Sequence, residues 1–316
     1  MRNFARLIPT LVAFPILVAA SLPAQELAGS APLEIIHGKP FVKVTINGQG
    51  PFRFVLDTGT GGEAIVSPQL ADQLNLPSAG QIQLGDPSGV GTRKVPLVQV
   101  QSLQVAGIEF TGVKAARHVL SEADGTCQGL LGFPLFRNYL LTLDYPRQRM
   151  TLAPGAVAPD GERSVMSFRS PDGIPIVPLR IGGLQVEALI DSGGGGLSLP
   201  ESLAARLKFS TVPAIFENAH SLATRFQVKA GQLAADIHLG SYTFAKPFVE
   251  INPAFPLANF GSCPMQNFAF TFDQRNHLVR MESGKTTLHL AATPTGARLQ
   301  NSPSEKDAES ALVPVG

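Results

Sequence analysis

Apolar residues in this chain fall mostly in short runs that end at glycine or proline. Two runs alternate apolar and polar positions, which is typical of a strand with one buried face. Each is followed by a glycine turn and then by a more continuously apolar run, typical of a strand buried on both faces. The alternating runs span 41–46 and 176–181, and the buried runs span 52–56 and 186–190. This pattern predicts a protein built mainly of β-strands.

A short helix is expected after each buried strand, over 68–74 in the first half and 200–207 in the second. Proline suits the first position of a helix, where its missing N–H has no partner to lose. Pro68 and Pro200 fit that position, and Ser67 can cap the first helix with its hydroxyl.

The chain repeats itself. The segment GFPLFRNYLLTLD at 132–144 aligns without a gap with GSCPMQNFAFTFD at 261–273, an offset of 129 residues from 132 to 261. Upstream, an Asp-Thr-Gly triplet at 57–59 aligns with an Asp-Ser-Gly triplet at 191–193, an offset of 134 residues. Small loop insertions explain the drift between the two offsets. We interpret the chain as two copies of one structural unit.

The N-terminus has the pattern of an export signal. Arg2 and Arg6 precede an apolar stretch at 7–20, and small residues suited to cleavage follow it. An uncleaved anchor is the alternative. After cleavage we expect an exported protein, periplasmic or secreted, without stable membrane insertion. The predicted organisation is a signal peptide at 1–24, a first copy at 33–153, a linker at 154–161, a second copy at 162–283 and a largely disordered tail at 284–316.

Composition narrows the range of functions. Of 316 residues, 44 % are hydrophobic, enough for a sizeable core, and 16 % are charged, with a net charge of +1. Without a basic stripe, nucleic acid is not expected as a partner. The two cysteines, Cys127 and Cys263, are compatible with one disulfide between the copies or with two thiols, and they predict no metal site.

The chemistry is suggested by the two triplets, because each ends a buried strand at the same point of the repeat. Average composition predicts about 0.2 such triplets by chance in a chain of this length. A single triplet is explained as an Asx-type turn, in which the aspartate bonds backbone amides. Two triplets at matching positions instead favour a pair of functional carboxylates, Asp57 and Asp191.

These motifs resemble the retropepsin-like and pepsin-like aspartic peptidases. The first copy matches with FVLDTG at 54–59, GLLG at 129–132 and LTLDY at 141–145. The second matches with ALIDSG at 188–193, NFG at 259–261 and FTFD at 270–273. The resemblance covers most of residues 35–283 and is closest to the retropepsin-like units of exported bacterial proteins, here present twice. It implies an all-β, bilobal aspartic-protease fold, with two duplicated β-barrel-like lobes and a cleft between them.

The resemblance also assigns roles. Asp57 and Asp191 would be the catalytic pair, sharing one proton and activating water for peptide-bond hydrolysis, with no cofactor and no metal. Support for the catalytic loops would come from hydrogen bonds across the two copies and from tight glycine turns that offer backbone N–H groups to the carboxylates. The residues in these supporting roles would be Thr58, Gly59, Ser192 and Gly193.

Substrate contacts are implied for a flap in the first copy and for the residues just after the triplets. These residues would be Gly85, Asp86, Gly91, Thr60 and Gly194. The implied partner is a peptide or protein substrate, and because one chain supplies both aspartates we expect a monomer.

Two departures from the family pattern leave an alternative open. The second triplet runs into four glycines at 193–196, for which we expect a mobile loop, and the flap candidate at 83–94 has no aromatic residue. The alternative is a catalytically inactive peptide-binding protein on the same bilobal fold. The scattered histidines suggest no catalytic role, and Asp144 and Asp273, each after a terminal strand, suggest turns or ion pairs.

Overall fold

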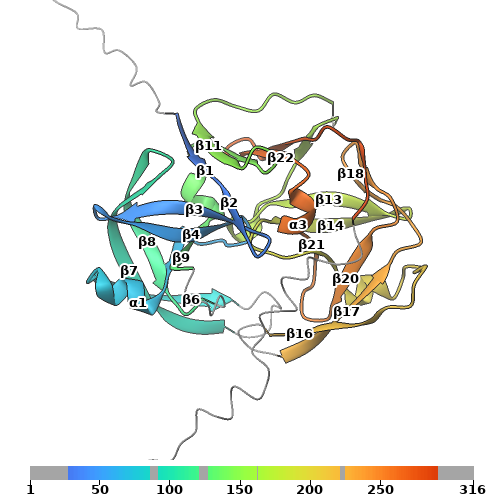
Figure 1. The fold of residues 1–316 in the computed structure, drawn as a ribbon, viewed down its shortest axis with the longest axis horizontal. Coiled ribbons are helices and arrows are strands. Elements are labelled where there is room, and N and C mark those ends of the chain that lie inside the picture. Colours follow the sequence, from blue (N-terminus) through green and yellow to red (C-terminus); the bar gives the residue numbers. More distant parts are fainter. Residues whose placement is uncertain (1–27, 86–91, 121–126, 162, 221–224, 291–316) are drawn as a thin grey trace, which may run out of the picture.

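A computed structural model describes residues 28–85, 92–120, 127–161, 163–220 and 225–290. The chain folds into two lobes made almost entirely of strands, so the expected all-β, bilobal fold is confirmed. Strands of the first copy, blue to green in Figure 1, lie on one side, and those of the second, yellow to orange, lie on the other. The predicted signal peptide lies outside the described residues.

The first lobe contains one eight-stranded sheet in the order β2-β3-β4-β9-β5-β8-β7-β6. Helix α1 (Pro68–Gln73) follows β5, and Ser67 caps it by accepting the Leu70 N–H at 3.2 Å. The strands of this sheet are β2 (Glu34–Ile36), β3 (Lys39–Ile46), β4 (Gln49–Asp57), β5 (Ala64–Val66), β6 (Ser78–Gly85), β7 (Thr92–Val105), β8 (Ile108–Arg117) and β9 (Gly129–Gly132).

The second lobe contains one ten-stranded sheet in the order β16-β17-β20-β15-β21-β14-β13-β18-β19-β24. Its strands are β13 (Ile176–Ile181), β14 (Leu184–Asp191), β15 (Leu197–Pro200), β16 (Ala214–His220), β17 (Arg225–Gln232), β18 (Ile237–Leu239), β19 (Tyr242–Phe244), β20 (Phe248–Asn252), β21 (Ala258–Gly261) and β24 (Thr287–Leu288).

Two predicted boundaries in this lobe differ from the structure. The helix expected over 200–207 is the shorter α2 (Glu201–Ala204), because Pro200 is extended and pairs with Asn252 as the last residue of β15. The second copy also extends past residue 283, since β24 pairs in parallel with β19 and buries Leu288. The described part of the predicted tail therefore belongs to the lobe; residues 291–316 lie outside the described residues.

A six-stranded sheet joins the lobes, in the order β1-β11-β10-β22-β23-β12. Its strands are β1 (Gly29–Pro32), β10 (Leu140–Asp144), β11 (Arg149–Ala153), β12 (Val165–Ser167), β22 (Ala269–Asp273) and β23 (Leu278–Glu282). At its centre β10 pairs antiparallel with β22, so the repeated segments face each other (Figure 1). The predicted linker starts after β11. Its Val157 is buried, and the Val157 N–H donates to Asp273 at 2.9 Å, which fixes the linker to β22.

Phenylalanines fill the contact between the lobes. Phe133, in the short 3-10 helix η1 (Phe133–Phe136), lies edge-on to Phe272 of β22, with ring centroids 5.2 Å apart. Phe168 contacts the same Phe133 ring from the second copy, and all three side chains are buried. Burial of one such ring is worth about 1.5–3 kcal/mol, so this contact holds the lobes in register. The Phe133 N–H also donates to the Thr60 carbonyl at 3.1 Å, which ties η1 to the loop that carries the first triplet.

Candidate active site

Equivalent strands deliver the two aspartates to one place. β4 pairs in parallel with β9, which sets Asp57 beside Gly132, and β14 pairs in parallel with β21, which sets Asp191 beside Gly261. The preceding Leu56 and Ile190 are completely buried. Each carboxyl therefore emerges at the end of a core strand, on the side where the lobes meet.

Thr58 and Ser192 lock the two triplets together. The Thr58 N–H donates to Ser192 Oγ at 3.0 Å, and the Ser192 N–H donates to Thr58 Oγ1 at 2.9 Å. Each hydroxyl in turn donates to a carbonyl of the other lobe, Thr58 to Ile190 and Ser192 to Leu56, both at 2.7 Å. Both side chains are fully buried, so these four hydrogen bonds form a symmetric clamp with no solvent competition.

Asp57 accepts two hydrogen bonds and lies against the opposite carboxyl. The Gly59 N–H donates to Oδ1 at 2.8 Å, and the Thr60 hydroxyl donates to Oδ2 at 3.0 Å. Burial, followed by the negative charge of Asp191, raises the pKa of Asp57 from 3.8 to about 7. A hydrogen bond with the Asp191 side chain raises this pKa further, whereas the bonds from Thr60 and Gly59 lower it.

Asp191 accepts three hydrogen bonds, all from N–H groups. The N–H groups of Gly193 and Gly194 both donate to Oδ1 at 2.9 Å, and Asn259 Nδ2 donates to Oδ2 at 2.7 Å. The contact from Asn259 was not expected from the sequence. The one hint of this contact in the sequence is that the polar Asn259 aligns with Leu130 of the first copy.

The triplet glycines are required for a reason other than the predicted tight turn. Neither Gly59 nor Gly193 has a positive φ, so both backbones are open to other residues. Instead, a Cβ on Gly59 would lie 2.6 Å from Asp191 Oδ1, and a Cβ on Gly193 would overlap the Asp57 carboxyl. Each glycine thus makes room for the aspartate of the opposite lobe.

The glycine run at 193–196 is held in place, contrary to the mobile loop expected from its composition. The carbonyl oxygens of the run accept backbone N–H groups from Ser262 at 3.2 Å, Cys263 at 2.9 Å and Gly261 at 3.0 Å. A Cβ on Gly194 would also lie 2.7 Å from Asp191 Oδ2. The run is therefore a tightly packed support for Asp191, in which Gly193 and Gly194 have no room for a side chain.

Two further residues, missed in the sequence, connect the lobes beneath the carboxyls. Tyr145 reaches α3 (Ser262–Met265) of the second lobe and accepts the Ser262 hydroxyl at 3.3 Å. At the aligned position of the second copy, Gln274 donates to the Phe133 carbonyl of the first at 2.7 Å. Burial raises the pKa of Tyr145 far above its ordinary range, so this phenol stays neutral.

The proposed substrate-binding residues are only partly assembled in the structure. Thr60 and Gly194 hydrogen-bond the aspartates, as described above. Gly85 is exposed at the end of β6, where it pairs with Thr92 across the hairpin. Asp86 and Gly91 lie outside the described residues.

Asp144 and Asp273 have the turn roles expected of them. Asp144 accepts the Arg147 N–H at 3.0 Å and forms an ion pair with its guanidinium at 2.9 Å. Asp273 accepts the N–H of Asn276 at 3.1 Å. The structure has Cys127 and Cys263 as thiols, not as the disulfide that remained possible from the sequence.

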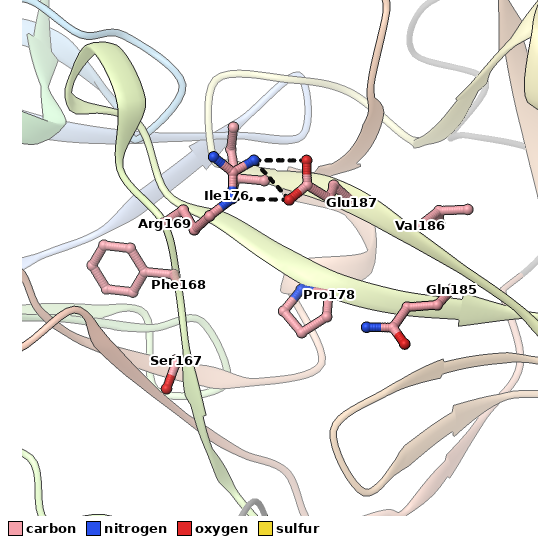
Figure 2. Close-up of a pocket in the computed structure, with 8 residues that line it drawn as sticks. All are labelled: Ser167, Phe168, Arg169, Ile176, Pro178, Gln185, Val186 and Glu187. Carbon is pink, nitrogen blue, oxygen red and sulfur yellow. Dashed lines mark hydrogen bonds and ion pairs between the residues drawn. The ribbon is translucent and has the colours of Figure 1, made fainter.

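A separate cavity of about 330 Å³ lies between the β13–β14 hairpin and residues 167–169. Figure 2 shows Arg169 and Glu187 joined across its rim, with a closest N–O distance of 2.6 Å. Both side chains are exposed, so this ion pair adds about 0–1 kcal/mol at most. Neither aspartate lines this cavity.

No helix in the described part of the chain is long and apolar enough to span a membrane. A family model described as aspartyl protease matches residues 42–135 and 177–267, more than half of the chain and one stretch in each copy. No curated protein matches the chain.

Proposed function

Because the chain belongs to the aspartyl protease family, we propose that it is an exported endopeptidase in which Asp57 and Asp191 together activate water against a peptide bond. One observation carries this proposal: at the junction of the lobes each carboxyl is held by the loop of its own triplet and packs against the triplet glycine of the opposite lobe. Peptides are the substrates implied by the family.

The reaction follows from the coupling of the two carboxyls. Two negative charges held close together repel each other strongly, so the pair shares one proton, as is general for aspartic proteases. The pKa of Asp57, raised to about 7 by burial and by the charge of Asp191, keeps this proton toward neutral pH. The ionised member accepts a proton from a water molecule between the two groups, and the water oxygen attacks the peptide carbonyl carbon. The protonated member donates to the carbonyl oxygen, which stabilises the tetrahedral intermediate.

The surrounding loops support activity over simple peptide binding. The clamp between Thr58 and Ser192 fixes the relative position of the carboxyls, and such positioning is a large part of catalysis. The packed glycine run answers one of the two sequence arguments for an inactive protein, and the flap without an aromatic residue is the other. We further propose export through the signal at 1–24, to the periplasm or the exterior, and a monomeric enzyme.

A peptide library incubated with the purified protein across a range of pH tests the proposal. We expect cleavage by the wild type and none by Asp57→Asn, which removes one half of the proton-sharing pair. A statine-type mimic of the tetrahedral intermediate should bind the wild type far more tightly than a substrate peptide. Peptide binding without cleavage at any pH would instead support the inactive peptide-binding protein.

A further inference from the structure

The two carboxyls have unequal hydrogen-bond partners, although they belong to copies of one unit. All three donors to Asp191 are N–H groups, from Gly193, Gly194 and Asn259. Asp57 has one N–H donor, from Gly59, and one hydroxyl donor, from Thr60.

This difference in donor type decides which carboxyl is better suited to hold the charge. A backbone or amide N–H can only donate, so its bond favours an ionised carboxylate. A hydroxyl can turn and accept instead, so Thr60 can satisfy Asp57 in either protonation state. The surroundings of Asp191 therefore select the charged form, whereas those of Asp57 tolerate the proton.

The extra donor is a specific departure from the repeat. Asn259 lies on β21 opposite Leu189 of β14, two residues before the position that pairs with Asp191. The same register in the first lobe places Leu130 opposite Val55, two residues before the position that pairs with Asp57. An aliphatic side chain in the first copy is thus replaced by an amide in the second, and that amide reaches the carboxylate.

We infer that Asn259 is a positioning residue that keeps Asp191 ionised, so that Asp191 acts as the general base and the shared proton resides on Asp57. The inference rests on the proposed function for its catalytic meaning, because it assigns the two roles within that reaction. The raised pKa of Asp57 agrees with this assignment.

Other titratable and charged groups near the pair do not produce the asymmetry in this direction. Tyr145 stays neutral because burial raises its pKa. Glu250 lies beside Gly196 of the second lobe, and as an acid it offers Asp191 no positive charge. Among the residues that the structure describes, the charged and titratable groups on the elements packed around the pair include Tyr145, Cys263, Glu250, Asp172, Glu63 and Arg137.

Two matched variants, each removing one side-chain donor, test the inference through the pH profile of kcat/KM. Asn259→Leu copies the residue of the first lobe and removes a donor from Asp191. Thr60→Ala removes the hydroxyl beside Asp57. If Asp191 ionises first, Asn259→Leu shifts the acid limb upward by about one pH unit and leaves the alkaline limb in place. Thr60→Ala then shifts only the alkaline limb upward.

The opposite assignment gives the opposite result. If the shared proton resided on Asp191, Asn259→Leu would move the alkaline limb and Thr60→Ala the acid limb, because a lost donor penalises most the states in which its carboxyl is charged. A uniform fall of kcat/KM at every pH in Asn259→Leu would make Asn259 merely structural. Either result overturns the inference.

A second measurement does not depend on turnover. An amide in place of Asp57 mimics the protonated carboxyl, whereas an amide in place of Asp191 turns its NH₂ toward N–H donors. At a pH between 3.8 and about 7, the interval over which only the folded protein holds the proton on Asp57, we expect Asp57→Asn to have a higher melting temperature than Asp191→Asn. The reverse order, or equal values, would overturn the inference. If the wild type cleaved no peptide while this order held, the proposed function would fail and the position of the proton would stand.

Discussion

The hydroxyls of Thr142 and Thr271 lie 2.9 Å apart where β10 and β22 cross the junction of the lobes. The two residues are direct partners in the antiparallel register, and they occupy the same position in the two copies. The local twofold axis of the duplication therefore passes between them. The six-stranded sheet is centred on this point, on the same axis that relates Asp57 to Asp191.

This pair leads to a prediction about stability. Thr142→Val or Thr271→Val alone should lower the free energy of unfolding by about 1–2 kcal/mol, because each leaves a shielded hydroxyl without its partner. The double variant should lose less than the sum of the two single losses, since two valines of similar shape replace the pair. Urea unfolding of the four proteins gives the coupling energy directly. Additive losses would mean that the hydroxyls contribute independently.

A second prediction concerns pH and does not require activity. The folded protein holds a proton on Asp57 up to about pH 7, whereas the unfolded chain releases it near pH 3.8. The folded state therefore binds more protons between these values, and its stability falls as the pH rises through them. Relative to Asp57→Asn, the melting temperature of the wild type should fall by several degrees across this interval. A constant difference would contradict the raised pKa.

The lack of space between the triplet glycines and the carboxyl of the opposite lobe gives a third prediction. Gly193→Ala places a methyl group against the Asp57 carboxyl, and a displacement of about 1 Å in a catalytic group can cost about 100-fold in rate. Gly62→Ala is a matched control on the first loop, because its Cβ would meet nothing within 4 Å and its φ is not positive. Peptide cleavage should fall about 100-fold in Gly193→Ala and stay close to wild type in Gly62→Ala. Equal activities would mean that the loop adjusts freely.

The sequence predicted local features correctly and failed where a feature depended on residues far apart in the chain. The alternation at 176–181 gave β13 its observed bounds, and Ser67 caps α1 as expected. The helix predicted from Pro200 began too early, because pairing with Asn252 keeps that proline in a strand. Strand pairing of this kind joins residues far apart in the chain, so local propensity does not include it.

The same distinction, between local features and features that depend on distant strand pairing, applies to the candidate site. The duplicated triplets predicted that Asp57 and Asp191 form a pair, because a repeat can be recognised from the sequence without knowledge of the fold. The donor role of Asn259 depends on the parallel register of β21 with β14, which a sequence pattern does not specify. The need for Gly193 depends on a carboxyl in the other lobe. Composition alone suggested a mobile glycine run, whereas tertiary hydrogen bonds hold it.

The last prediction concerns assembly. Both aspartates come from one chain, and backbone pairing between β10 and β22 joins the lobes within that chain. A protein that needs no second copy should keep the same activity per molecule at every concentration, because no subunit equilibrium limits the site.

The measurement is the specific rate of peptide cleavage over a wide dilution series, with sedimentation of the same samples to report mass. We expect a constant specific rate and the mass of one chain throughout. A rate that falls on dilution, together with a larger mass at high concentration, would show that the active species is an assembly of chains. In that case the contact between Asp57 and Asp191 within one chain would not suffice for activity, and the site would need a contribution from a second molecule.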